Sequence, residues 1–230
     1  MKKRAFFFVI ILKLSVLISC SKNQDYFSAN EGKTIFYEII FIDKEKKQKI
    51  FRQSLYFSPE LEEIHPVIKN DGEIIFYFKD DNGISKIKPD LSVLNIKKPL
   101  KNDEQSQLIL AFPIITGTEW VTNDRTTLQM KLGYDRVYDS DLPLNVNYRI
   151  ISTNETISIN GKKIKNCIKI SGYGKTSFNP GPPLGNINIE VLSKTWISLD
   201  LGIVKYKREE ISDSETMGKI SYEKTILVDP

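Results

Sequence analysis

Alternation of apolar and polar side chains is the main pattern from residue 34 onward. Within residues 34–42, Ile35, Tyr37, Ile39 and Phe41 occupy every second position, which places them on one face of an extended strand. The same pattern predicts strands at 49–57, 74–78, 84–88, 108–115, 127–132, 146–150, 156–159, 163–173, 187–199, 203–208 and 220–228. No helical stripe of useful length interrupts them, so the chain is predicted to be built from strands.

Turn signals separate the predicted strands. Asn82-Gly83 and Asn160-Gly161 each lie between two apolar runs, and Asn-Gly is the strongest short signal for a β-hairpin. Ser58-Pro59 is typical of a helix start and predicts one or two helical turns up to Ile64. Three polar stretches are predicted to be loops or connections: 89–107, 133–143 and 177–186.

These elements predict an all-β fold. We expect an antiparallel meander that forms a curved sheet or half-barrel, with at most one or two short helices. Residues 33–230 are predicted to form a single β-rich domain, which is long enough to bury a proper core. The connection at 89–107 can divide this domain into halves at 33–100 and 107–230.

The first twenty residues follow a different pattern. Lys2, Lys3 and Arg4 form a basic start, and residues 5–18 form an apolar run that one charged residue, Lys13, interrupts. A basic start followed by a short apolar run is typical of a secretory signal peptide. The run is too short for a transmembrane helix, which needs about 20 apolar residues.

Leu17-Ile18-Ser19-Cys20 ends this leader and resembles the lipobox of bacterial lipoproteins. The resemblance implies cleavage between Ser19 and Cys20, with acyl chains such as palmitate on Cys20. Residues 1–19 are then the signal peptide, and residues 20–32 are a lipidated tether. Two or more acyl chains hold a protein at a membrane stably, so this lipid is the predicted membrane contact. Many Gram-negative members that stay at the inner membrane have Asp where this chain has Ser21, which implies the outer membrane, with the domain facing the periplasm or the cell exterior.

Charge gives no sign of a nucleic-acid partner. The sequence has 33 basic and 29 acidic residues, and four of the basic residues lie in the leader. The chain that follows therefore has 29 residues of each sign and no dense basic block with interleaved aromatic residues.

Catalytic and metal-binding patterns are also missing from the sequence. His65 is the single histidine, and a serine or cysteine hydrolase needs a base close to its nucleophile. We therefore predict no enzyme activity, no cofactor and no metal site. Once Cys20 carries lipid, Cys167 has no cysteine partner for a disulfide or a zinc site. Strict alternation places Cys167 beside two lysines, where its thiol would be reactive, whereas a bulge or a covering element would bury it.

A second resemblance covers about residues 108–210. It consists of an FP…G…W pattern at 112–120, a G…C hairpin at 161–167 and G-I-V-K at 202–205. These motifs are similar to a recurring pattern in uncharacterised bacterial envelope lipoproteins. The resemblance implies a curved antiparallel sheet like the half-barrels of lipoprotein carriers, and it implies no activity.

Two binding functions are compatible with these observations. The preferred one is a non-catalytic interaction module that contacts an envelope protein through its sheet edges or the loop at 179–185. The alternative is a carrier that holds a lipid or a lipoprotein acyl chain in a concave sheet face. The aromatic residues Trp120, Trp196, Phe76 and Tyr148 are the candidates for lining such an apolar pocket, although strand aromatics also serve as ordinary core.

Overall fold

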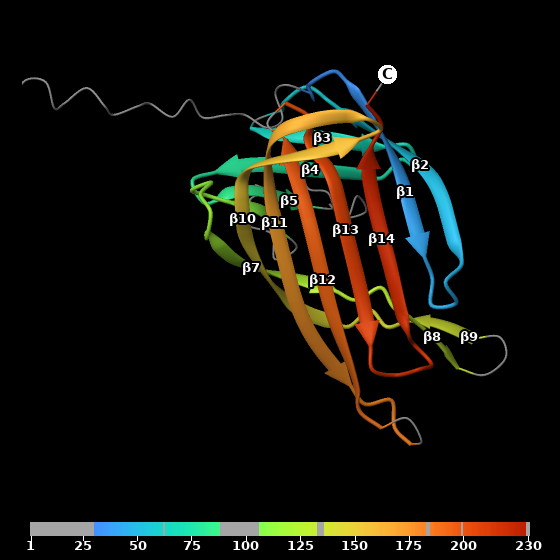
Figure 1. Cartoon of the computed structure of the whole chain (residues 1–230). Coiled ribbons are helices and arrows are strands. Elements are labelled where there is room, and N and C mark those ends of the chain that lie inside the picture. Colours follow the sequence, from blue (N-terminus) through green and yellow to red (C-terminus); the bar gives the residue numbers. More distant parts are fainter. Residues whose placement is uncertain are drawn as a thin grey trace, which may run out of the picture.

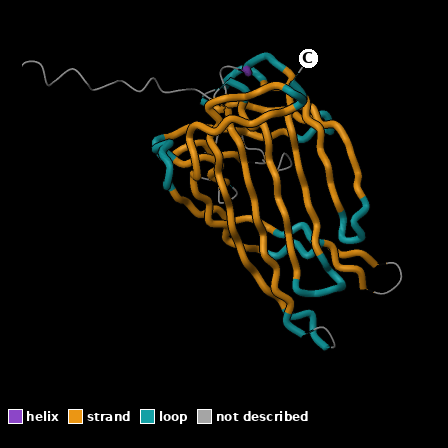
Figure 2. The backbone as a smooth tube through the Cα atoms, in the orientation of Figure 1, coloured by secondary structure: helices purple, strands orange, loops and turns teal. Residues whose placement is uncertain are grey.

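The structure is a computed structural model that describes residues 30–61, 63–87, 106–132, 136–182, 185–198 and 200–228. The predicted leader, the lipobox with Ser19 and Cys20, and most of the tether lie outside these residues, as does nearly all of the predicted connection at 89–107. The described residues form strands and turns and contain no α-helix (Figure 2). Among them, no helix has the length and hydropathy needed to cross a membrane.

Fourteen strands follow one another in the described residues, and all strand pairs are antiparallel. Twelve of them form one sheet in the order β6-β5-β4-β3-β2-β1-β14-β13-β12-β11-β10-β7, and the other two, β8 and β9, form a hairpin. Their bounds are β1 (Thr34–Ile42), β2 (Gln48–Phe57), β3 (Ile64–Lys69), β4 (Ile74–Asp80), β5 (Gly83–Ile87), β6 (Gln107–Ala111), β7 (Glu119–Arg125), β8 (Gln129–Leu132), β9 (Arg136–Asp139), β10 (Pro143–Ile159), β11 (Lys162–Phe178), β12 (Ile187–Ser198), β13 (Gly202–Ser212) and β14 (Lys219–Ile226). The predicted all-β antiparallel fold is confirmed, with strands curved around an interior (Figure 1).

The two edge strands of the large sheet, β6 and β7, come together and nearly close it into a barrel. Side chains of β7 join them to the β6 backbone: Trp120 Nε1 and Thr122 Oγ1 each donate a hydrogen bond to the Leu108 carbonyl at 3.0 Å. In the other direction, Gln107 Nε2 donates to the Asn123 carbonyl at 3.1 Å. No backbone ladder joins β6 to β7 among the described strands, so this seam is held by side chains.

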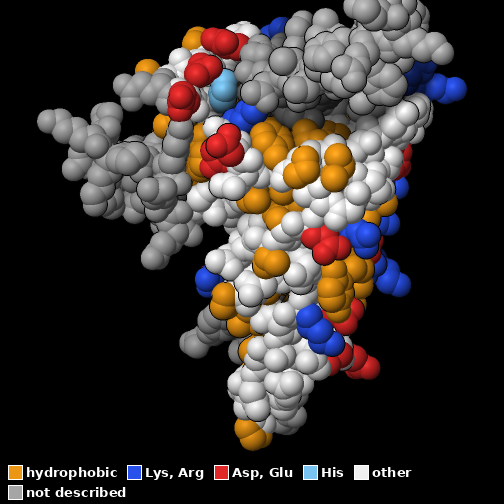
Figure 3. Space-filling model, turned by 90° about the vertical axis from the view of Figure 1, so that its left-hand side faces the viewer, with side chains coloured by type: hydrophobic (Ala, Val, Ile, Leu, Met, Phe, Trp, Pro, Cys, Tyr) orange, Lys and Arg blue, Asp and Glu red, His pale blue; other side chains and the backbone are white. Residues whose placement is uncertain are grey.

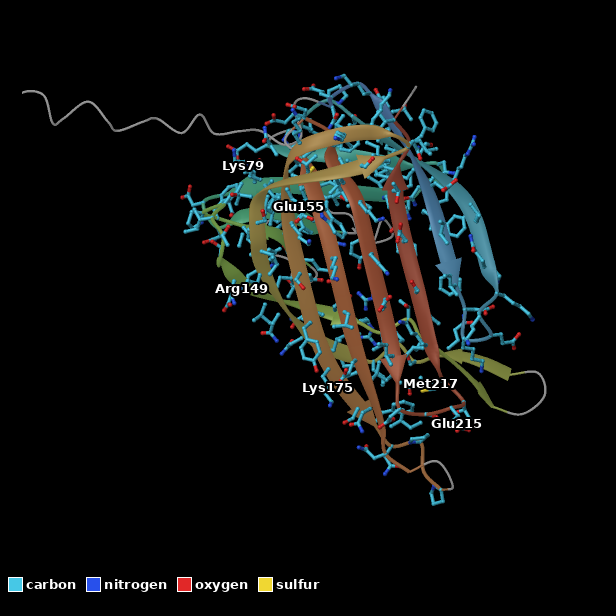
Figure 4. The ribbon with its side chains drawn as sticks, viewed as in Figure 1. Lys79, Arg149, Glu155, Lys175, Glu215 and Met217 are labelled. Carbon is cyan, nitrogen blue, oxygen red and sulfur yellow. The ribbon has the colours of Figure 1, made fainter. Side chains whose placement is uncertain are left out.

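The long hairpin of β10 and β11 bends across one end of the sheet, which we call the capped end (Figure 1). Its pairing register shifts between residues 150 and 157 of β10, and such bulges bend a strand pair. The turn at its tip has positive φ angles at Asn160 and Gly161, 50° and 80°, as the Asn-Gly signal predicts. Glu155 lies near the capped end, and Met217 lies near the opposite end, which we call the turn end (Figure 4).

Buried apolar residues form two clusters. The larger one extends to the capped end and includes Val67, Leu110 and Ile170. The smaller one includes Leu128 and Met217. The inward residues of β1 match the predicted alternation, since Tyr37 and Ile39 are each only 1% exposed.

Two predictions of local structure were wrong. The helix expected from Ser58-Pro59 is absent, because Leu61 and Ile64 exchange backbone hydrogen bonds at 2.8 and 2.9 Å and close a tight turn into β3. The loop expected at 133–143 contains β9 and the start of β10, because β9 pairs with β8 as a hairpin. Local signals cannot reveal this pairing, since it depends on the partner strand.

Cys167 is fully buried, which agrees with the alternative in which a bulge or a covering element buries the thiol. Asn166 has a φ of 56°, and two residues of β11 lie opposite one residue of β10 at this point. This bulge breaks the alternation that would have placed the thiol beside lysines. Burial, followed by the nearby Glu155 carboxylate, raises the pKa of the Cys167 thiol, so this residue is an inert part of the core.

Candidate functional site: a charged chamber inside the sheet

A cavity of about 420 Å³, here called the chamber, is lined by residues of both apolar clusters. Inward side chains from all parts of the large sheet line it. Apolar groups come mainly from β4, β6, β12 and β13, and tyrosine rings come from β4, β10, β13 and β14. Five basic and two acidic side chains also line the chamber. Charged groups in an interior must be paired or must serve a ligand, because burial of an unpaired charge is costly.

Arg208 forms ion pairs with both of the acidic side chains that line the chamber. Its Nη1 atom lies 2.5 Å from Oδ2 of Asp124 on β7, and its Nε atom lies 2.8 Å from Oε1 of Glu210. Glu210, only 1% exposed, also accepts hydrogen bonds from the backbone N–H groups of Thr127 at 2.8 Å and Leu128 at 3.0 Å. These contacts tie β13 to the segment after β7, across the interior.

Lys224 on β14 is the least compensated of the lining cations. Its Nζ atom donates a hydrogen bond to Oε1 of Gln53 at 2.9 Å and lies 4.1 Å from the ring centroid of Tyr37. Among the described residues, no carboxylate forms an ion pair with it. Burial, together with the charges of Lys69 and Lys86, lowers the pKa of Lys224 to about 8. Perturbed pKa values of this kind are concentrated at functional sites.

The other two lysines of the chamber come from β3 and β5. Lys69 forms an ion pair with Glu73 and a second one with Asp71 at 3.4 Å. Lys86 also takes part in interactions, and its positive charge helps to lower the pKa of Lys224. Thus Lys224, Lys69 and Lys86 bring three cations from three strands to one interior.

One tyrosine of the chamber lining belongs to a stacked aromatic pair. Tyr148 lines the chamber and stacks on Trp120, with 5.5 Å between ring centroids and 17° between ring planes. Tyr148 lies over Gly172 of the neighbouring strand, where an added Cβ would lie 2.5 Å from Cε1 of the tyrosine ring. A glycine is therefore needed here for the ring to lie flat against β11. Burial raises the pKa of Tyr148, and raises that of Tyr222 to about 12, so both phenols stay neutral near pH 7.

A small apolar pocket of about 50 Å³ extends the chamber toward the capped end. Leu55, Phe57 and Leu110 are among its lining residues, and Lys224 lines both this pocket and the chamber. Lys224 therefore stands where the apolar pocket opens into the charged space.

Near the turn end, the chamber shares Phe41 and Thr127 with an open hollow that is also lined by Thr126, Gln129 and Asp141. The hollow therefore adjoins the chamber at these two residues. The face of the molecule shown in Figure 3 carries hydrophobic side chains with charged groups of both signs around them.

The four aromatic residues proposed from the sequence do not form one pocket. Tyr148 lines the chamber, and Trp120 stacks on it without lining the chamber itself. Trp196 lies on the other face of β12, where its Nε1 atom donates to Glu155 at 3.2 Å and Lys169 lies over its ring. Phe76 is half-buried and does not line the chamber.

Sequence reasoning missed Lys224, Arg208 and Glu210. The sequence did contain one signal for Lys224. It alternates in step with Ile220, Tyr222 and Ile226, so it lies on the same, apolar face of the strand. The described residues contain no group of His, Cys, Asp and Glu side chains placed to hold a metal ion. His65 is buried outside the chamber lining, with Glu60 at 3.9 Å.

The fold and the chamber define an antiparallel barrel-like protein with a charged interior. No protein-family model and no curated protein matches the sequence. Among solved structures, the chain is similar to the hypothetical lipoprotein YmcC from Escherichia coli K12, with 11% sequence identity and a TM-score of 0.38. The alignment covers 86% of this chain and 88% of that chain. Such a distant likeness assigns neither a family nor a function.

Proposed function

We propose that this chain is a lipid-anchored, non-catalytic protein of the bacterial envelope that binds a small molecule inside its barrel-like sheet. The anchor is the lipid on Cys20 that the lipobox-like sequence implies. The single observation that carries the binding function is the chamber of about 420 Å³ with its charged and hydroxyl-bearing lining. Ligand sites are typically about 300–1,000 Å³, with a few polar groups set in an apolar wall.

The location of the edge strands favours this function over a protein-interaction module that uses sheet edges. β6 and β7 face each other across the seam, where Trp120, Thr122 and Gln107 bind the opposite backbone. Their edge groups are therefore covered by the protein itself. The interior, in contrast, offers a space lined with polar groups.

Filling the chamber tests the proposal. Thr195 on β12 lines the chamber, and Thr225 on β14 lies on the outer face between Lys224 and Ile226. Thr195→Trp should abolish binding of decanoate and decanol, whereas Thr225→Trp should leave it unchanged. Native mass spectrometry of the full processed chain, released from non-ionic detergent micelles, measures the bound fraction for each variant.

Two outcomes would refute the proposal. One is that neither decanoate nor decanol binds to the unmodified protein. The other is that Thr195→Trp binds them as well as Thr225→Trp does, which would place the ligand outside the chamber. The anchor is tested separately, because Cys20→Ser should move the protein from the membrane fraction to the aqueous fraction.

A further inference from the structure

We propose that the ligand of the chamber is a medium-chain carboxylate whose carboxylate group binds at Lys224 and whose chain lies along the apolar wall. This inference rests on the proposed function and names the chemical class of its ligand. It follows from the charge, the shape and the volume of the chamber.

The charge of the chamber selects an anion. Its two lining carboxylates, Asp124 and Glu210, are both occupied by Arg208. Lys224 has the Gln53 amide oxygen and the Tyr37 ring as its contacts, with no carboxylate partner among the described residues. Lys69 and Lys86 add positive charge at the same place, and burial together with these two charges lowers the pKa of Lys224. A ligand carboxylate would supply the missing counter-charge through a charge-assisted hydrogen bond.

The wall around Lys224 selects an amphiphile. Ile109, Ile197 and Ile203 line both the chamber and the small apolar pocket, and Lys224 lines both as well. Ile75 and Leu108 continue the apolar surface within the chamber. A ligand with its anionic group at Lys224 therefore has apolar side chains alongside its chain, and transfer of that chain out of water favours binding.

The volume limits the length of the chain. A volume of about 420 Å³ lies near the lower end of the range typical of ligand sites, about 300–1,000 Å³. It suits one chain of medium length, such as that of dodecanoate, better than hexadecanoate or a two-chain phospholipid. Affinity should rise about fourfold for each added methylene up to dodecanoate and then fall.

The experiment compares headgroups and chain lengths on the same protein. Native mass spectrometry of the full processed chain should show dodecanoate bound at least about tenfold more tightly than dodecanol, since a charge-assisted hydrogen bond is worth about a factor of ten or more. Lys224→Met should remove this difference by weakening dodecanoate alone. Lys194→Met removes the same charge from an exposed position of β12 and should change neither ligand. Lys224→Arg should restore the preference for dodecanoate.

Each contrary result overturns a stated part of the inference. Equal binding of dodecanol and dodecanoate to the unmodified protein would exclude an anion site, although the proposed function would stand if Thr195→Trp still abolished both. Tighter binding of hexadecanoate than of dodecanoate would exclude the length limit. Because the headgroup comparison needs no variant, it decides the matter even if a Lys224 variant fails to fold.

Discussion

Replacing Lys224 with methionine should stabilise the protein near neutral pH. Burial and two neighbouring cations lower the folded-state pKa of Lys224 to about 8, from an ordinary value of 10.5. In the unfolded chain the group is solvated and keeps the ordinary value. The folded state thus disfavours the protonated lysine, and one pKa unit corresponds to about 1.4 kcal/mol. The shift of about 2.5 units costs about 3 kcal/mol of stability wherever both states are protonated, which is below about pH 8.

The pH dependence has a definite sign. Between about pH 8 and 10.5 the unfolded chain binds the proton and the folded chain releases it, so stability of the unmodified protein rises with pH in this window. Lys224→Met lacks this dependence, and its methylene and thioether groups fill the same space. Its advantage over the unmodified protein should therefore fall by about 2 kcal/mol between about pH 7 and 9.5. The methionine variant also loses the hydrogen bond to Gln53 and the contact with the Tyr37 ring, and both losses reduce its gain in stability.

Urea unfolding of the two ligand-free proteins at several pH values measures this difference. The raised pKa values of tyrosines such as Tyr77 and Tyr222 make stability fall above about pH 10, but this effect is common to both proteins and cancels in the comparison. A constant difference between the proteins from about pH 7 to 9.5 would refute the reasoning. It would mean that Lys224 is as well solvated or as well paired in the folded state as in the unfolded one.

Three further predictions concern the groups around the chamber. Glu210→Ala should lower the free energy of unfolding by about 3 kcal/mol or more, because Nε of Arg208 and the buried N–H groups of Thr127 and Leu128 lose their acceptor. Glu209→Ala on the outer face should cost less than about 1 kcal/mol, and similar losses for the two variants in urea unfolding would contradict this. Gly172→Ala should cost about 1–3 kcal/mol and displace the ring of Tyr148, and an unchanged near-ultraviolet circular dichroism spectrum would argue against the close contact. Cys167 should react with a maleimide at the rate of global unfolding, and rapid labelling of the folded protein would exclude its burial.

Local signals predicted most of the strands. The alternation in residues 34–42 matches β1, and the Asn82-Gly83 and Asn160-Gly161 pairs mark real hairpin turns, at β4–β5 and β10–β11. These features are determined within a few residues. Side chains alternate along any strand, and Asn160-Gly161 adopts the positive φ angles that a tight hairpin needs. At β4–β5, Asp80 pairs with Gly83, so the signal marks the turn although Asn82 has no positive φ.

The errors occurred where distant parts of the chain decide the structure. Ser58-Pro59 is compatible with a helix start, but pairing of β3 with β2 and β4 extends the chain directly after it. The burial of Cys167 depends on a bulge that bends the β10–β11 hairpin over the capped end. Neither the strand partner nor the covering element is visible in a local pattern.

The chamber was not predictable from strand patterns because closure of the sheet creates it. A lysine in an amphipathic strand normally marks the solvent face, and Lys224 is enclosed only when β6 meets β7. The same closure places Asp124 of β7 opposite Arg208 of β13, which are 84 positions apart in the sequence. The aromatic candidates were chosen by residue type, and of the four only Tyr148 lines the chamber, with Trp120 stacked on it.

The pKa of Lys224 with and without ligand tests the central claim most directly. Nuclear magnetic resonance of the Nζ group, or of the adjacent methylene, in selectively labelled protein follows this titration. The account predicts a pKa of about 8 in the free protein and a return to about 10.5 or above when dodecanoate is bound, because the carboxylate stabilises the charged lysine. A pKa that stays the same when dodecanoate is bound would contradict the account, since the ligand would then lie away from the lysine.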